Sequence, residues 1–142
     1  MVEAIMTNES ILVVEDDDLL RKLLQDQIAK AGYQVRTTSR VPGALQEVGN
    51  QMPDLVVLDL TLEVDDPFAQ LNDGFGFLGM LRHRHPTANP AVIIFTENHS
   101  PEVVTRAKKI GVHSVINKKA GIGELVSAIQ AALEDSKKPI AS

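Results

Sequence analysis

Two short apolar runs, each ending in carboxylates, place the strongest constraint on how this chain can fold. Leu55–Leu58 is apolar without alternation and precedes Asp59, and Ile11–Val14 precedes Glu15 and three aspartates. A continuous apolar run of this length is typical of a strand buried on both faces in a parallel sheet. Because ligands bind beyond the carboxyl ends of such strands, the two runs predict one acidic pocket at one sheet edge.

The acidic pocket favours a hard cation. Asp59 alone fits a helix cap as well as a chemical group, and the second acidic cluster favours the chemical role. Crowded carboxylates repel one another, so the pocket needs a cation or a retained proton. The chain has no cysteine, which excludes disulfides, thiolate zinc sites and a cysteine nucleophile. Oxygen ligands alone favour Mg²⁺ above other metals.

Composition excludes several classes of protein. The chain has 142 residues and is 44% hydrophobic, which fits a single domain with its own core. Its net charge is −5 and no block is strongly basic, so we expect no nucleic-acid binding. No apolar run approaches the ~20 residues of a membrane span, and residues 1–10 lack the basic start of a signal peptide. We therefore expect a cytoplasmic protein without membrane contact.

Strand and helix patterns alternate along the chain. We expect strands at 11–14, 33–37, 55–58, 91–95 and 112–117. We expect helices at 18–31, 41–50, 74–85 and 122–135, and one that Ser100 caps, Pro101 opens and Gly111 closes. Residues 11–135 would form the domain, with a flexible lead-in at 1–10 and a flexible tail at 136–142.

This alternation predicts an α/β fold with three layers. Five strand–helix units favour a doubly wound (βα)5 arrangement around a five-stranded parallel sheet. Right-handed crossovers and one amphipathic edge strand, at 33–37, allow the flavodoxin-like order 2-1-3-4-5. In that order Asp16 and Asp59 end neighbouring strands, which agrees with the single acidic pocket.

Two further polar residues end the remaining strands. Thr96 follows the fourth strand and Lys118 follows the fifth. Each alone fits an ordinary strand end, but four matching strand ends in chain order are far more specific. A carboxylate can attack phosphorus as a nucleophile, while a metal and an ammonium neutralise phosphoryl oxygens. The set therefore predicts phosphoryl chemistry.

These residues resemble the receiver domain of a response regulator in two-component signalling, of the single-domain, chemotaxis-regulator-like type. The resemblance covers residues 10–135 and is carried by Val14–Asp17, Asp59, Asp73-Gly74, Thr96 and Lys118. It implies that Asp59 accepts a phosphoryl group from a histidine kinase or a phosphotransfer protein. It also implies that Asp16 and Asp59 bind Mg²⁺, helped by Glu15 and the backbone carbonyl of Thr61. Thr96 and Lys118 would contact the phosphoryl group.

The resemblance also implies how the signal leaves the domain. Phosphorylation would shift an existing equilibrium at the face formed by the fourth helix, fifth strand and fifth helix, where a protein partner or a second copy binds. Because little chain follows Asp135, we expect no DNA-binding output domain, although an excised piece of a longer protein would look the same. The chain would be a signalling protein that assists its own phosphorylation and dephosphorylation, not an enzyme.

Four positions depart from the family pattern. Glu63 replaces a usual proline within a long segment, Thr61–Asp73, that would cover the site or bind a partner. Val115 stands where a switching aromatic is common. Lys119 replaces the proline that usually follows the lysine, so we expect no cis peptide there. Glu97 replaces a small residue, and it would either slow phosphoryl access or point to solvent.

Other signals carry less weight. Gly74–Gly79 matches G-x-G-x-x-G but does not follow a strand directly, and His83 and His85 share no helix face. Lys108, Lys109, Lys118 and Lys119 form either a basic patch or a solvated surface.

Two alternative functions remain open. A receiver-like scaffold would bind partners without phosphorylation. A flavodoxin-like electron carrier would need a phosphate-cradling loop where this chain has four acids. An Asp-nucleophile phosphatase is disfavoured, because Thr61 stands where its second aspartate is expected.

Overall fold

One parallel sheet organises the molecule. The computed structural model describes residues 9–60 and 74–137, so the predictions for Thr61 and for Glu63 fall outside the described residues. The strands are β1 (Ser10–Val14), β2 (Gln34–Thr38), β3 (Leu55–Leu58), β4 (Ala91–Thr96) and β5 (Ser114–Asn117). They pair in the order β2-β1-β3-β4-β5, and every pair is parallel. The predicted order is therefore confirmed.

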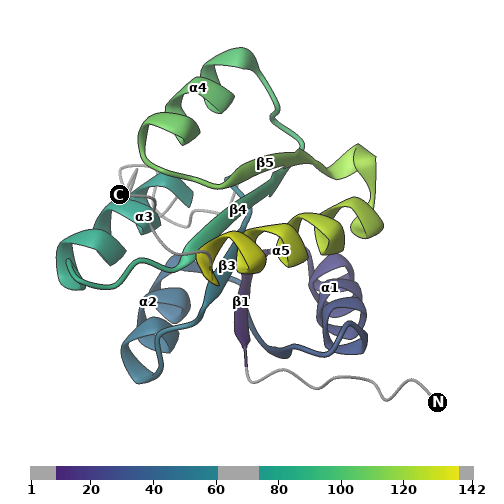
Figure 1. The fold of residues 1–142 in the computed structure, drawn as a ribbon, viewed down its shortest axis with the longest axis horizontal. Coiled ribbons are helices and arrows are strands. Elements are labelled where there is room, and N and C mark those ends of the chain that lie inside the picture. The colour runs from purple at the N-terminus through teal and green to yellow at the C-terminus, as the bar shows by residue number, and fades with distance from the viewer. Residues whose placement is uncertain (1–8, 61–73, 138–142) are drawn as a thin grey trace.

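Helices cover both faces of the sheet (Figure 1). They are α1 (Asp18–Lys30), α2 (Val41–Asn50), α3 (Gly74–Arg84), α4 (Pro101–Lys109) and α5 (Ile122–Lys137), with a short 3₁₀ turn, η2 (Lys118–Ala120), after β5. Helices α1 and α5 bury their apolar stripes on one face, and α2, α3 and α4 cover the other. None of the helices in the described ranges is long and apolar enough to cross a bilayer.

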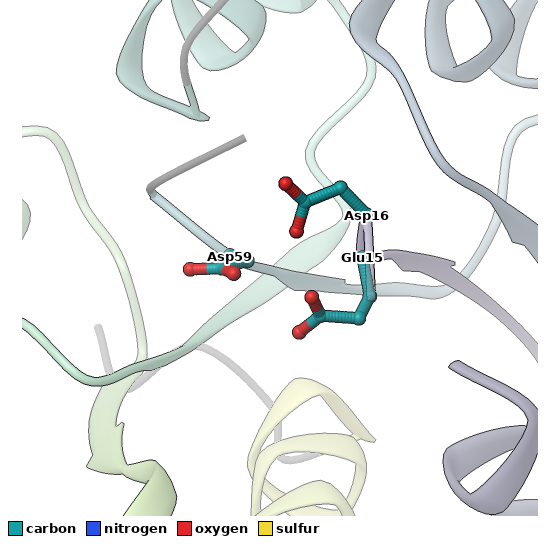
Figure 2. A group of neighbouring side chains, drawn as sticks. All are labelled: Glu15, Asp16 and Asp59. Atoms are coloured by element: carbon teal, nitrogen blue, oxygen red, sulfur yellow. The ribbon is translucent and has the colours of Figure 1, made fainter. Parts of the chain in front are cut away.

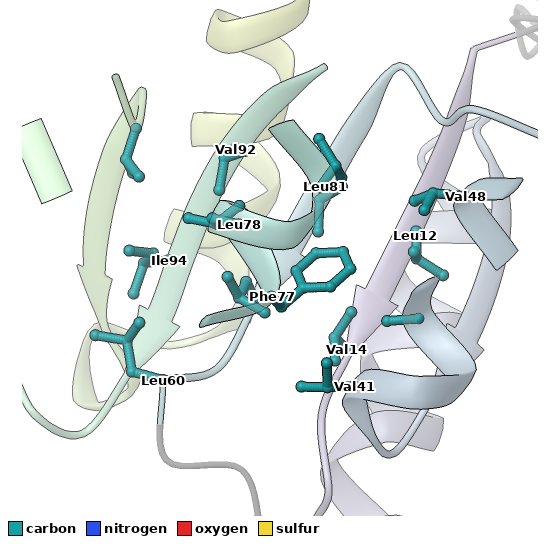
Figure 3. Close-up of a cluster of buried hydrophobic side chains, with 14 of the residues drawn as sticks. Leu12, Val14, Val41, Val48, Leu60, Phe77, Leu78, Leu81, Val92 and Ile94 are labelled. Carbon is teal, nitrogen blue, oxygen red and sulfur yellow. The ribbon is translucent and has the colours of Figure 1, made fainter. Parts of the chain in front are cut away.

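The core has two halves because side chains alternate across each strand. In β1, Ile11 and Val13 point towards α1 and α5, whereas Leu12 and Val14 point towards α2 and α3. Every residue of β1 and β3 is buried, as the continuous apolar runs predict. Phe77 of α3 is fully buried at the centre of the second half (Figure 3).

Helix caps follow the sequence. The Asp17 side chain accepts a hydrogen bond from the backbone N–H of Leu20 at 2.9 Å and starts α1. The Ser100 hydroxyl accepts one from Val103 at 3.3 Å, and Pro101 occupies the first turn of α4. These contacts satisfy backbone donors that a helix start leaves unpaired. The expected start of the fourth helix is confirmed.

Several element ends differ from the expected ones. β5 begins at Ser114 rather than Val112, because the N–H of Val112 bonds to the carbonyl of Ala107 and closes the end of α4. β2 runs from Gln34, the residue that pairs with Ser10 of β1, to Thr38. Helix α5 continues two residues beyond the expected end, to Lys137. These ends depend on long-range backbone bonds that local patterns do not report.

Candidate functional site

The register of β1 and β3 brings the predicted carboxylates together. Val14 lies opposite Leu58, and the N–H of Asp59 donates to the carbonyl of Val14 at 3.1 Å. Glu15, Asp16 and Asp59 therefore leave the sheet side by side (Figure 2), and one carboxylate oxygen from each lies within 4.8 Å of the others. No other group of three or more metal-ligating side chains of this kind occurs within residues 9–60 and 74–137. The expected acidic pocket is present.

Lys118 joins this pocket from the end of β5. Its Nζ lies 2.8 Å from Oε1 of Glu15 and 2.9 Å from Oδ2 of Asp59. Glu15 and Asp59 are each only 2% exposed, so the ammonium offsets charges that water reaches poorly. Three carboxylates and one ammonium leave excess negative charge when ionised. The donor set thus fits a divalent, oxygen-preferring cation such as Mg²⁺.

The backbone between β1 and α1 is held by Arg21. Its Nη1 donates to the carbonyl of Glu15 at 2.9 Å, and its Nη2 donates to Oδ1 of Asp18 at 2.6 Å. The N–H of Asp17 donates to Oε2 of Glu15 at 3.1 Å. Sequence reasoning missed Arg21. Asp18 and Arg21 are three residues apart on one predicted helix, and this spacing could have indicated their ion pair.

Thr96 ends β4 at the same edge of the sheet. It is fully buried, it lies opposite Asn117 in β5, and its hydroxyl accepts a hydrogen bond from the N–H of Asn98 at 3.2 Å. Glu97 is exposed, which favours the solvent-facing alternative. Because Lys118 directly follows Asn117, the ends of β4 and β5 also meet at this edge.

Val115 and the loop after β4 are linked by a hydrogen bond. Nε2 of His99 lies 3.2 Å from the carbonyl oxygen of Val115, so the imidazole N–H donates. Val115 is half-buried against the core. The Lys118–Lys119 peptide bond is trans like the others in the described ranges, as expected without proline.

The glycine motif, the two histidines and the lysines that carried less weight in the sequence have ordinary structural explanations. The glycine motif lies inside α3 rather than after a strand. His83 and His85 take no part in the metal-ligating group found in the described residues. Lys108, Lys109, Lys118 and Lys119 were expected to form either a basic patch or a solvated surface. Lys118 fits neither alternative, because it pairs with Glu15 and Asp59 in the acidic pocket.

Comparison with known proteins identifies the family. The model of the response regulator receiver domain matches residues 11–130. The chain belongs to this family. The receiver domain is also similar to the KDP operon transcriptional regulatory protein KdpE of Escherichia coli, with 29% identity over 90% of this chain and 52% of that protein. The DNA-binding transcriptional regulator NtrC of a Bradyrhizobium species is 26% identical over 94% of this chain and 26% of that protein.

A solved structure shows the same fold. The CheY-like response regulator receiver domain protein from Methanospirillum hungatei superposes with a TM-score of 0.78, covering 92% of this chain and 98% of that one at 21% identity. The receiver domain spans about a quarter of the NtrC relative and about half of KdpE. Within this family, the cluster of Glu15, Asp16 and Asp59 fits a magnesium and phosphoaspartate site.

Burial sets the protonation of the receiver domain's pocket. Desolvation raises the pKa of the Glu15 carboxyl from 4.5 to about 7, although hydrogen bonds from Lys118 and from the N–H of Asp17 oppose it. Desolvation lowers the pKa of the Lys118 ammonium, but its hydrogen bonds to Glu15 and Asp59 outweigh that effect and raise it. Lys118 therefore stays charged at neutral pH, whereas Glu15 titrates there.

Stability without Mg²⁺ is expected to fall as pH rises from about 4.5 to about 7. Folded Glu15 keeps its proton up to about pH 7, while the unfolded chain loses it near 4.5, so folding is favoured at the acid end. The raised pKa corresponds to a decrease of up to about 3 kcal/mol in the free energy of unfolding over this pH range. Urea unfolding in chelator, compared between wild type and Glu15→Gln, isolates this contribution. Parallel pH profiles for the two proteins would contradict it.

Gly74 allows α3 to start against the backbone of Asp59. A Cβ at this position would lie 2.7 Å from the Asp59 carbonyl oxygen and 3.0 Å from Cα of Leu60. Gly74→Ala is therefore expected to lower the free energy of unfolding by about 1–3 kcal/mol, measured by urea denaturation. Gly79→Ala in the same helix meets nothing within 4 Å, and should instead raise it by up to ~1 kcal/mol. Equal effects would refute the steric explanation.

Proposed function

We propose that this receiver domain is a phosphoacceptor in a two-component or phosphorelay system, with Asp59 as the acceptor. The observation that carries the proposal is the position of the Asp59 carboxylate, which is buried beside two further acids and 2.9 Å from the Lys118 ammonium. A carboxylate in such a place has few structural uses. The unit that acts would be residues 11–135, with short flanking segments at 1–10 and 136–142.

The reaction is a transfer between a phosphohistidine and Asp59. An oxygen of the Asp59 carboxylate attacks phosphorus and forms a P–O bond. The P–N bond to the donor imidazole breaks, and its electron pair leaves with the imidazole nitrogen, which then takes a proton. The product is an acyl phosphate on Asp59. Lys118 supplies positive charge to a phosphoryl oxygen, and the Thr96 hydroxyl donates a hydrogen bond to another.

Mg²⁺ is the proposed cofactor. Asp16 and Asp59 would hold it directly, Glu15 through water, and the backbone carbonyl of Thr61 would supply a further oxygen. When bound, the cation neutralises charge on the phosphoryl oxygens. Carboxylate oxygens bind the cation only when they are ionised. Mg²⁺ would therefore compete with the proton on Glu15 and favour the ionised carboxylate, the state that Glu15 otherwise reaches above pH 7.

The proposed partners are proteins. A histidine kinase or a phosphotransfer protein donates the phosphoryl group, and a downstream protein or a second copy binds the face of α4, β5 and α5. Val115 has no aromatic ring that could change rotamer on that face. The conformational change after phosphorylation would therefore involve another side chain. We propose a cytoplasmic signalling protein without enzymatic turnover. Its relative NtrC is described as DNA-binding, and this receiver domain spans about a quarter of that protein.

Intact mass after incubation with acetyl phosphate tests this function. Wild type with Mg²⁺ should gain one phosphoryl group, whereas Asp59→Asn and wild type in chelator should gain none. Asp26→Asn, which changes an exposed aspartate of α1, is the matched control and should be labelled normally. An unlabelled wild type, under conditions that label a known receiver, would favour the scaffold alternative. Labelling of the Asp59→Asn variant would show that another residue accepts the phosphoryl group.

A further inference from the structure

Two arginines cross between α3 and α4 and frame a small cleft. The guanidinium of Arg106 in α4 lies over the ring of Phe75 in α3, 4.2 Å from its centroid. Arg82 of α3 donates a hydrogen bond to the carbonyl of Ile110 at the end of α4. The cleft between these contacts has a volume of about 150 Å³. Among the described residues it is lined by Phe75, Leu78, Gly79, Arg82, Arg106 and Ile110.

The described residues that line this cleft are mainly apolar, and several of them are partly exposed. Phe75 and Ile110 are only partly buried, and Gly79 is exposed, with no atom within 4 Å of the position of an added Cβ. Helix α3 thus presents apolar surface outside the core, next to a residue without a side chain. A volume of this size accommodates one or two apolar side chains of a bound segment.

The two helices that form the cleft carry a net positive charge. Helices α3 and α4 carry one acid, Glu102, and five lysines and arginines: Arg82, Arg84, Arg106, Lys108 and Lys109. None of these five cations lies within salt-bridge distance of a carboxylate in residues 9–60 and 74–137, whereas Arg21, Arg36 and Lys137 each have one. The chain as a whole has a net charge of −5. Five of the chain's 14 lysines and arginines thus lie on these two helices, without a carboxylate partner among the described residues.

We propose that the α3–α4 cleft binds an acidic, amphipathic segment of a partner protein. An apolar side chain of that segment would occupy the cleft, and flanking carboxylates would pair with Arg82 and Arg106. Each guanidinium has five N–H donors in a planar fork that suits a carboxylate. Within residues 9–60 and 74–137, Arg82 donates one hydrogen bond, to the carbonyl of Ile110. Arg106 stacks on Phe75 through the face of its guanidinium, which leaves the N–H groups at the edge pointing away from the ring.

The apolar floor favours a peptide over nucleic acid. Binding to a nucleic acid depends on cations that follow its phosphates, and it makes little use of an apolar cleft between two helices. An amphipathic helix lays apolar anchors into a groove at spacings of three and four residues. The cleft shares helix α4 with the proposed α4-β5-α5 face, and its lining residues differ from those of the acidic pocket. The inference does not depend on phosphorylation of Asp59.

A designed peptide tests the proposal on the full chain. The probe is a fluorescein-labelled helical peptide with leucines every three or four residues flanked by glutamates. Its affinity is measured by fluorescence anisotropy, beside a peptide with serines for the leucines and a duplex DNA of arbitrary sequence. We expect the leucine peptide to bind most tightly and to shift the amide NMR signals of Phe75, Gly79 and Gly111. Equal binding of the serine peptide, tighter binding of DNA, or no peptide binding would overturn the proposal.

Variants then locate the contact. Arg106→Met should weaken peptide binding about tenfold, while Lys30→Met, which removes an equal charge from the exposed end of α1, should change it less than twofold. Arg106→Glu should bind a peptide in which lysines replace the glutamates, and this rescue would not follow from a structural role alone. Thermal unfolding of each variant shows that it is folded. Equal losses in Arg106→Met and Lys30→Met, or no charge-reversal rescue, would refute the assignment.

Discussion

Lys118→Met is expected to lower the free energy of unfolding by about 3 kcal/mol at pH 8 without Mg²⁺. The wild-type ammonium lies within 3 Å of both Glu15 and Asp59, and the two carboxylates are each 2% exposed. Removing it leaves two buried negative charges without their shared cation, and the lost attraction greatly exceeds the gain from an apolar side chain. The same change should slow Mg²⁺-dependent labelling by acetyl phosphate, because a phosphoryl group on Asp59 would lose the positive charge of Lys118.

A double-mutant cycle tests the physical reason. If repulsion between buried carboxylates causes the loss, Glu15→Gln in the Lys118→Met background should recover part of the stability, as measured by urea unfolding. Lys119→Met is the matched control, since Lys119 is exposed and its side chain makes no contact with a carboxylate in the described ranges. A loss that is equal in Lys119→Met, or that Glu15→Gln deepens, would exclude this explanation. Added Mg²⁺ should reduce the difference between wild type and Lys118→Met.

Phe77→Ala is expected to lower the free energy of unfolding by about 3–5 kcal/mol. Phe77 is completely buried among residues of β1, β3, β4 and α2 (Figure 3). Its side chain is the largest of the fully buried ones in the described residues. Truncation removes its apolar surface from the core and leaves a cavity between α3 and the sheet. Because α3 starts against the backbone of Asp59, the acidic pocket should also become less well ordered.

Phe75→Ala, two residues earlier in the same helix, is the control for this experiment. Phe75 is only partly buried and stacks under Arg106, so its loss should cost about 1–2 kcal/mol, less than that of Phe77. Urea denaturation with an unchanged slope would attribute both effects to the folded state. Similar losses for the two variants would show that the packing of Phe77 is not what anchors α3.

The order of the strands and helices and the position of the acidic pocket could both be predicted from the sequence. Continuous apolar runs at β1 and β3 specify strands buried on both faces, and the carboxyl ends of parallel strands meet at one edge of the sheet. In the order 2-1-3-4-5, Asp16 and Asp59 were therefore expected to end neighbouring strands. The cap at Ser100 was equally readable, because a helix start depends on residues adjacent in the chain.

The contacts between side chains, at that edge and elsewhere, could not be predicted without the folded structure. Register and rotamers, not periodicity, place Lys118 against both Glu15 and Asp59 and direct Arg21 to the carbonyl of Glu15. The close approach of Gly74 to Asp59 arises where a helix meets a strand end, between residues fifteen positions apart. The α3–α4 cleft likewise needs two helices brought together by the sheet. A sequence pattern reports local geometry, whereas contacts between distant residues depend on how whole elements pack.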